Sequence, residues 1–364
     1  MKSEESWFFS LKGEIHPMRI MDMLLAEQTL FRNEEVFNPE YVPEEILYRD
    51  AQIRELMLSI KPSLRGGKAG NCFLIGPPST GKTTCTKLVL SEIKDMKKII
   101  PAYINCQIYD TPFKIFSEIH RRIFGFSPPE TGVPLSAVYD KIFSHISKEK
   151  KVLVAALDEA ACLFSKDNSN GVFYKILRAY ETYPEAKTCL WVISTKDEMH
   201  RLDDKVRSVF MPNIIRFQKY SAKEMKEILK RRCEEGLYKG VVTDGIIESI
   251  YDNANDLRHA IELARKAVLA AENEGSKRVT VQHVENIIKN IMPEKEIADD
   301  ERIIIEALKK GSMDAGELFS SVKNKMSYSK FYRILKKMES DGMVEMKSAT
   351  KGRGKTTVIK LTER

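Results

Sequence analysis

A glycine-rich segment early in the chain constrains the fold more than any other feature. Residues 76–83 read GPPSTGKT, which is the G-x-x-x-x-G-K-T pattern of phosphate-binding loops. The apolar run 72–75 before it is typical of a buried strand, and the segment 83–90 after it is compatible with a helix. Strand, glycine-rich loop and helix start are the context that this motif needs, so we predict a P-loop in an α/β fold. An ordinary glycine–proline turn is the alternative.

The chemistry of the loop assigns roles to its residues. Gly76 and Gly81 let the backbone turn so that N–H groups face phosphate oxygens. Lys82 would reach the β- and γ-phosphates, and Thr83 would place its hydroxyl on Mg²⁺. We predict that ATP or ADP with Mg²⁺ is bound by Gly76, Pro77, Pro78, Ser79, Thr80, Gly81, Lys82, Thr83 and Thr84.

A long apolar run, 152–157, ends in two acids, Asp158 and Glu159. This is typical of a buried parallel strand that delivers carboxylates to its C-terminal end, the Walker B pattern. We predict that Asp158 orients Mg²⁺ together with Thr83, and that Glu159 polarises the attacking water. Further strands are predicted at 99–104, 189–194 and 213–217. Strands that alternate with helices predict a parallel sheet with the nucleotide at its C-terminal edge.

The strand signal stops after Phe217. Ser221 and Glu224 form a capping box at the start of a helix. Further helices are predicted at 245–251, 256–271 and 280–291, which indicates an all-helical unit. Three more helices, at 301–308, 313–322 and 329–340, precede strands 343–346 and 357–361 around a basic loop, the order expected of a winged helix. We predict domains at 1–218, 219–294 and 295–364.

The basic excess of the chain lies at its C-terminal end. The net charge is +7, but residues 321–364 alone carry +8, so the other 320 residues together carry −1. A localised basic patch is typical of nucleic-acid binding. We predict that the third helix enters the major groove of double-stranded DNA and that the loop reaches phosphates or the minor groove. The predicted DNA-binding residues are Ser329, Lys330, Arg333, Lys336, Lys337, Lys351, Arg353 and Lys355. A winged helix that binds a protein is the alternative.

Cysteine usage and hydropathy narrow the class of protein. The six cysteines include no C-x-x-C pair, which suits a reducing compartment without disulfides or zinc. No apolar run approaches the length of a membrane span, and acids precede the short apolar patch at the N-terminus, unlike a signal peptide. We expect a cytoplasmic, nucleoid-associated protein with no membrane partner.

Motif order and spacing give the chain a family likeness. From about residue 30 to its C-terminus it resembles the archaeal replication-initiator family, relatives of the eukaryotic origin recognition complex subunits and of the cell-division-control helicase loader. The likeness rests on residues 41–43, 49–50, 76–83, 104–106, 111–113, 157–159, 217–220 and 256–258 and on Arg353 between two glycines. It implies an AAA+ ATPase base, an all-α lid and a C-terminal winged helix. Other initiator subunits and the replicative helicase are the implied protein partners.

The resemblance also implies roles for residues outside the loop. Val42, Pro43 and Arg49 would border the adenine. Arg258 matches the second sensor, whose guanidinium approaches the γ-phosphate, and Lys205 or Arg207 lies where an inter-subunit arginine finger is sought. The basic face of the helix at 111–124, with Lys114, Arg121 and Arg122, corresponds to the family's initiator-specific motif, which also touches DNA. A solvated helix face is the alternative for these three residues.

Three positions depart from the family pattern. Thr195 replaces the usual asparagine of the first sensor, Asn255 stands where glycine is expected, and Lys205 stands where arginine is usual. A hydroxyl can hold water or phosphate, but with shorter reach than an amide. We therefore predict a divergent initiator that couples nucleotide state to DNA binding, with weak ATP hydrolysis. The alternatives are a DNA-binding regulator that never turns ATP over, and an adaptor that uses its winged helix on proteins.

Overall fold

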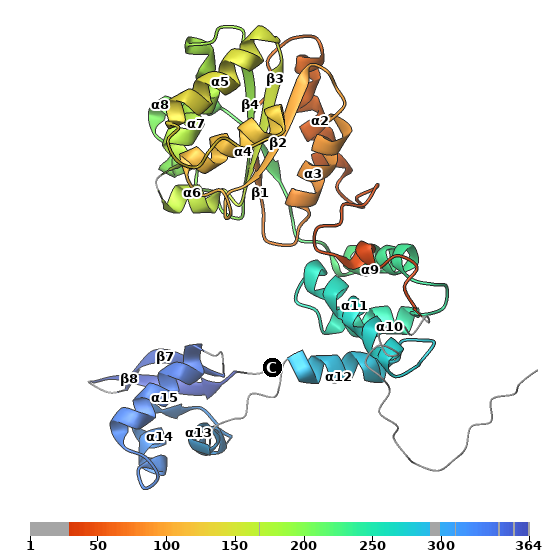
Figure 1. Ribbon diagram of the computed structural model, residues 1–364. Coiled ribbons are helices and arrows are strands. Elements are labelled where there is room, and N and C mark those ends of the chain that lie inside the picture. Colours follow the sequence, from red (N-terminus) through yellow and green to blue (C-terminus); the bar gives the residue numbers. More distant parts are fainter. Residues whose placement is uncertain are drawn as a thin grey trace, which may run out of the picture. The chain divides into compact units, whose positions relative to one another are not determined.

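The computed structural model describes residues 29–166, 168–291, 299–309, 311–340, 343–351 and 354–362. The chain divides into two compact units, Met1–Val284 and Glu285–Arg364 (Figure 1). Each unit has its own buried apolar core. No helix within the described ranges is long and apolar enough to cross a bilayer.

A five-stranded parallel sheet forms the centre of the first unit, in the order β2-β3-β4-β1-β5. Its strands are β1 (Cys72–Ile75), β2 (Ile99–Asn105), β3 (Val152–Asp158), β4 (Lys187–Ser194) and β5 (Asn213–Arg216). All of β3 is buried, because strands flank it on both sides and helices cover both faces. The predicted α/β fold with a parallel sheet is confirmed.

Helices cover both faces of this sheet (Figure 1). On one face lie α2 (Asp50–Leu64) and α3 (Lys82–Glu92); on the other lie α4 (Pro112–Phe124), α5 (Leu135–Lys148), α6 (Ala161–Ser165), α7 (Ser169–Leu177) and α8 (Asp204–Phe210). Short 3-10 turns occur at η1 (Glu34–Phe37), η2 (Ala179–Glu181) and η3 (Met199–Arg201). Alternate residues of β3 enter the two cores, Leu153 and Leu157 on one face and Val154 and Ala156 on the other.

A helical lid completes the first unit. Its helices are α9 (Ala222–Gly236), α10 (Asp244–Asp252), α11 (Leu257–Asn273) and α12 (Val281–Ile291), the last of which crosses the division between the units. The predicted capping box is present, because Ser221 and Glu224 each accept the other's backbone N–H. The N-terminal arm, residues 29–47, packs on the C-terminal end of α9: a Cβ on Gly236 would lie 2.4 Å from the Phe37 ring.

The second unit consists of helices and a small antiparallel sheet. The elements are α13 (Asp299–Leu308), β6 (Met313–Asp314), α14 (Ala315–Val322), α15 (Tyr328–Ser340), β7 (Val344–Lys351) and β8 (Gly354–Leu361), with the strands in the order β6-β8-β7. These are the elements that a winged helix comprises.

Two local predictions for this unit were wrong. Met313 lies in strand β6, opposite Ile359, and not in a helix. The helix starts only at Ala315, because the Asp314 side chain accepts the Glu317 N–H and caps it. The segment 347–355 is mostly strand rather than loop, since β7 and β8 stay in register as far as Lys351 and Gly354.

Candidate nucleotide-binding site

The loop between β1 and α3 has a backbone that its two glycines make possible. A Cβ on Gly76 would lie 2.1 Å from the Phe217 carbonyl oxygen, so no side chain fits there. Gly81 has a φ of +88°, which glycine adopts without strain. Ser79 has a φ of +58°. A positive φ is uncommon for residues other than glycine, and such residues are concentrated at functional sites. A curled backbone of this kind can gather N–H groups around an anion.

Lys82 lies at the first position of α3 and is only 8% exposed. Its ammonium donates to the carbonyl oxygens of Gly76 and Pro77, both at 2.7 Å. Burial lowers the pKa of Lys82, while the nearby Asp158 carboxylate opposes this shift. The ammonium is therefore held within the loop, in reach of an anion that the loop binds.

The acidic end of β3 lies beside the loop. Asp158 is 3% exposed, and its Oδ2 accepts the Thr83 hydroxyl at 2.7 Å and the Tyr103 hydroxyl at 2.8 Å. Its Oδ1 accepts the Glu159 N–H at 2.8 Å, and Glu159 has a φ of +51°. Carboxylate and hydroxyl oxygens suit Mg²⁺. Since the described residues contain no cluster of three His, Cys, Asp or Glu that could hold a metal, such an ion would take its other oxygen ligands from phosphate and water.

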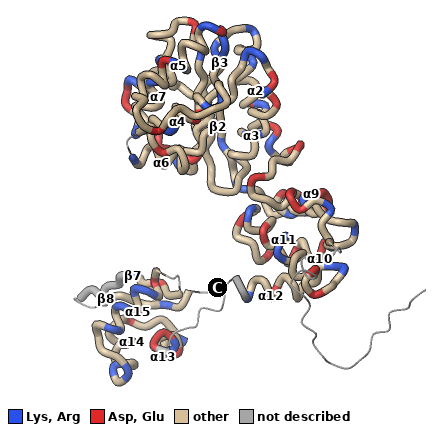
Figure 2. Tube along the Cα trace, viewed as in Figure 1, with Lys and Arg blue, Asp and Glu red and all other residues tan. Residues whose placement is uncertain are grey.

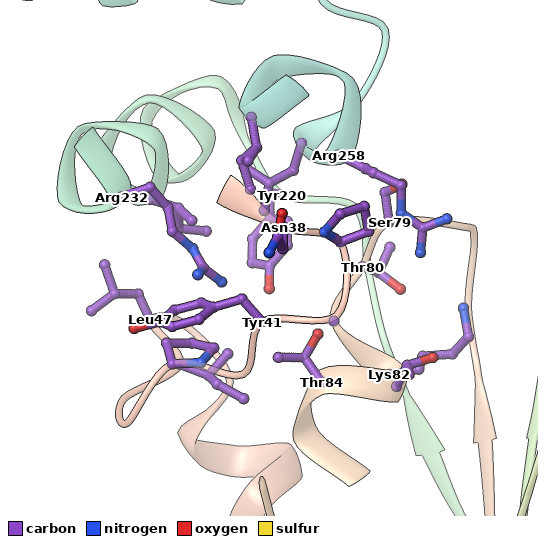
Figure 3. A pocket seen from close by; sticks show the side chains of 18 of the residues that line it. Asn38, Tyr41, Leu47, Ser79, Thr80, Lys82, Thr84, Tyr220, Arg232 and Arg258 are labelled. Carbon is purple, nitrogen blue, oxygen red and sulfur yellow. The ribbon is translucent and has the colours of Figure 1, made fainter. Parts of the chain in front are cut away.

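A cavity of about 410 Å³ adjoins the loop (Figure 3). This volume is within the range of small-molecule sites. The cavity brings together a large share of the predicted nucleotide residues: Pro43, Pro78, Ser79, Thr80, Gly81, Lys82, Thr83, Thr84, Glu159, Thr195 and Arg258. Gly76 and Pro77 take part through the carbonyls that bind Lys82, whereas Val42 does not line the cavity.

The end of the cavity away from the loop contains residues to which the sequence analysis gave no role. The Arg232 guanidinium lies 4.6 Å from the centroid of the Tyr41 ring and donates to the Val36 carbonyl at 3.1 Å. Burial lowers the pKa of Arg232. Tyr41 comes from the arm and Arg232 from the lid, and only the fold brings them together (Figure 3). The sequence pointed to this part of the site only through Tyr41, because residues 41–43 are among those that carry the family resemblance.

Arg49 does not line the cavity, although it was predicted to border the adenine. It is 5% exposed and donates to the carbonyls of Thr80, Tyr48 and Gln218 at 2.8–2.9 Å. Its guanidinium also stacks 3.8 Å from the centroid of Tyr220. Because a planar guanidinium can serve three acceptors at once, Arg49 fastens the P-loop to the segment that leads into the lid.

The sensor and finger candidates lie in different surroundings. Thr195 follows the end of β4 and Arg258 lies in the first turn of α11, and Figure 3 shows Arg258 on the side of the cavity that holds Ser79 and Lys82. Lys205 and Arg207 lie exposed on α8, outside this cavity. Arg207 donates to the Leu202 carbonyl at 2.8 Å, so its side chain folds back on its own turn.

The basic residues of α4 have acidic neighbours within the first unit. Lys114 pairs with Asp110 at 2.9 Å, and Arg121 and Arg122 pair with Glu118 at 2.6 and 2.8 Å. Burial opposes ionisation of Glu118, but the two arginines outweigh it and lower its pKa. The proposed contact of this face with DNA stays a prediction, and these carboxylates already balance part of its charge.

The basic face predicted for α15 is divided. Lys330 pairs with Asp300 at 2.7 Å and Lys337 with Glu301 at 2.8 Å, and both acids belong to α13. Figure 2 shows basic positions on α15 and acidic positions on α13. The other three predicted residues, Ser329, Arg333 and Lys336, are exposed, as is Lys337. The sequence analysis had not assigned Tyr328 and Tyr332, which are 58% and 38% exposed on the same helix.

The basic wing is described only in part. Lys351 ends β7 and Lys355 lies opposite Thr350 on β8. Arg353 lies outside the described residues.

These features define a class of protein. A P-loop after an inner strand of the sheet, an acidic pair at the end of β3 and a helical lid that lines the same cavity are the parts of a P-loop ATPase of the AAA+ kind. A family description, the Cdc6 AAA+ ATPase-type lid domain, matches residues 226–288. The ORC1-type DNA replication protein 2 of Methanothermobacter thermautotrophicus is 37% identical over 356 residues, which cover 93% of this chain and 94% of that protein. The chain belongs to this family of ORC1-type DNA replication proteins, and the predicted resemblance is confirmed.

Solved structures share the fold over nearly the whole chain. The Aeropyrum pernix ORC1 protein in complex with DNA has a TM-score of 0.66 at 24% identity, covering 92% of this chain and 94% of that one. The Aeropyrum pernix ORC2 protein in its ADPNP–ADP complexes has a TM-score of 0.64 at 22% identity, covering 91% and 94%. The base, lid and C-terminal unit therefore follow a known arrangement of elements.

Proposed function

We propose that this chain is an ATP-dependent DNA-binding protein of replication initiation, acting at origins or in helicase loading. The observation that carries the proposal is the cavity whose walls come from the P-loop, the arm and the lid together. A ligand held by all three favours one arrangement of base and lid over others. Family membership supports the replication role, since relatives are named DNA replication proteins and one fold neighbour was solved on DNA.

The residues of the site fit ATP or ADP with Mg²⁺. The loop backbone and the Lys82 ammonium would hold the phosphates, and Thr83 and Asp158 would hold Mg²⁺. The bound ion would neutralise charge on the phosphates. The cavity end lined by Pro43, Tyr41 and Arg232 would take the base. A fold neighbour with ADPNP and ADP supports this assignment.

We expect hydrolysis to be slow. Glu159 would polarise the attacking water, and Arg258 would approach the γ-phosphate from the lid. Thr195 is half-buried at the position of the first sensor, where its short hydroxyl reaches less far than an amide. Multiple-turnover phosphate release that Glu159→Gln abolishes would establish turnover. No release above that of Glu159→Gln would favour the regulator that only binds ATP.

Duplex DNA is the proposed partner of the second unit. Ser329, Arg333 and Lys336 on α15 present an exposed polar and basic face, and Lys351 and Lys355 of β7 and β8 stay predicted contacts. Other initiator subunits and the replicative helicase are proposed protein partners, with Lys205 or Arg207 acting across a subunit boundary. With these partners, the proposed localisation is the cytoplasm, in association with the nucleoid.

The testing experiment measures binding of a mixed-sequence duplex by fluorescence anisotropy, with ATP, ADP or no nucleotide, across a salt series. The proteins are the full chain, Lys82→Ala, the double variant Arg333→Ala/Lys336→Ala, and Lys148→Ala as an exposed lysine of the first unit. We expect a steep salt dependence whose slope falls by about 2 in the double variant, because each of the two cations would neutralise one phosphate. We expect the nucleotide effect to vanish in Lys82→Ala.

Two outcomes would contradict the proposal. A duplex affinity that is the same with ATP, with ADP and without nucleotide would indicate that ATP is only a structural ligand. The absence of duplex binding at moderate salt would favour an adaptor whose second unit binds proteins.

A further inference from the structure

Tyr103 lies next to the site, although the family likeness gives it no role. Its hydroxyl donates to Oδ2 of Asp158 at 2.8 Å, the same oxygen that accepts the Thr83 hydroxyl at 2.7 Å. We propose that Tyr103 is a positioning residue for the magnesium site, because its hydroxyl fixes the Asp158 carboxylate with Oδ2 toward Thr83. This inference rests on the proposed function, which takes Thr83 and Asp158 as the magnesium ligands.

The register of the sheet explains how Tyr103 reaches the carboxylate. On neighbouring parallel strands, Tyr103 lies opposite Ala156, and Asn105 lies opposite Asp158. Ala156 and Asp158 share one face of β3, because side chains two residues apart point the same way. Ala156 carries only a methyl group, which leaves room for the Tyr103 ring to extend along the strand toward Asp158.

The Tyr103 ring is itself held in place. The Lys87 ammonium lies 5.1 Å from its centroid, and Lys87 pairs with Glu40 of the arm. Lys87 belongs to α3, the helix that begins at Lys82. The ring is thus fixed between β3, which ends at Asp158, and α3, which begins at Lys82.

The hydrogen bonds at Asp158 define what Tyr103 contributes. Without the Tyr103 hydroxyl, Oδ2 depends on Thr83 alone, and Thr83 must also offer its oxygen to the cation. The carboxylate then rotates more freely. Metal binding must restrict this rotation, which reduces the affinity for the metal. Outer-shell partners of metal ligands typically change metal affinity by about 10–100-fold, and we expect about tenfold here. Tyr103 does not line the cavity, so nucleotide binding without metal is expected to stay unchanged.

The test uses Tyr103→Phe, which removes one oxygen and keeps the ring. The matched control is Tyr183→Phe, which loses an equivalent bond to Asp140 at 2.7 Å, away from the site. Binding of a fluorescent ADP analogue is titrated in EDTA and then against Mg²⁺, and thermal melting is recorded for each protein. We expect Tyr103→Phe to match wild type within about twofold in EDTA and to need about tenfold more Mg²⁺ for half of the metal effect. Tyr183→Phe is expected to behave as wild type.

Two results would overturn the inference. An unchanged Mg²⁺ requirement in Tyr103→Phe would show that the hydroxyl does not position the carboxylate. An equal loss of affinity with and without Mg²⁺ would assign Tyr103 a merely structural role. Asp158→Asn separates these outcomes from failure of the proposed function: if it leaves the Mg²⁺ effect intact, the magnesium site itself is misplaced.

Discussion

The nucleotide site is specified by its backbone, whereas the basic face of α15 is specified by its side chains. Gly76 has no room for a Cβ, and Gly81 adopts a left-handed φ of +88°. On α15 the backbone is regular helix, and Lys330 shares its charge with an acid of α13. A substitution in the loop therefore disturbs geometry, while a substitution on α15 changes one charge among several.

The largest expected effect is the loss of the loop lysine. Lys82→Ala removes the ammonium that bonds inside the loop, together with the charge-assisted hydrogen bonds proposed to phosphate. Two such bonds are worth about 4 kcal/mol, so we expect nucleotide affinity to fall by about 1,000-fold. Isothermal titration with ADP measures this change. Lys94→Ala, an exposed lysine just beyond α3, is the control, and a comparable loss there would mean that only net charge matters.

The next effect tests the role of the backbone directly. Gly76→Ala places a Cβ 2.1 Å from the Phe217 carbonyl, so the strand or the loop must move. We expect the free energy of unfolding of the first unit to fall by about 3 kcal/mol. Gly171→Ala adds the same methyl group in helix α7, where no atom beyond the adjoining residues and the helix's own backbone lies within 4 Å, and a gain of about 0.5 kcal/mol is expected. Urea unfolding compares the two, and equal effects would show that the loop can relax around a side chain.

Local patterns predicted much of this architecture. The apolar run 152–157 and the capping box at Ser221 depend on neighbouring residues only, and both are present. The short strand β6 gave no such signal, because two residues form a strand only when β8 lies beside them.

The interactions that the sequence could not predict join distant segments. Tyr103 and Asp158 are 55 residues apart, and Arg232 meets Tyr41 only where the lid meets the arm. The ion pairs of α15 were missed for the same reason, since their acids belong to α13.

A third prediction concerns the brace behind the loop. Arg49→Lys keeps the charge but cannot serve the Thr80, Tyr48 and Gln218 carbonyls together. We expect a loss of about 2 kcal/mol in the unfolding free energy of the first unit, because one buried and two partly buried acceptors lose their donor. Arg54→Lys, on the exposed side of α2, the helix that begins directly after Arg49, is the control and should change stability by less than about 0.5 kcal/mol. If the two variants change the free energy of unfolding equally, the forked geometry of the Arg49 guanidinium contributes nothing to stability.

The smallest effect sharpens the contrast on α15. Arg333 is exposed and faces away from the apolar core, so Arg333→Ala should weaken duplex binding about tenfold, as expected when one arginine no longer binds DNA. Lys330→Ala removes a charge already engaged by Asp300, and we expect a change of no more than about threefold, with less than about 1 kcal/mol of stability lost. Anisotropy titrations at one fixed salt concentration measure both. If Lys330→Ala weakens binding as much as Arg333→Ala, the Asp300 pair opens on DNA and α15 binds with its whole basic face. If instead Asp300→Asn strengthens binding, Asp300 on α13 weakens the attraction between α15 and DNA. The packing of α13 against α15 would then determine the charge of this surface, just as the backbone determines the geometry of the loop.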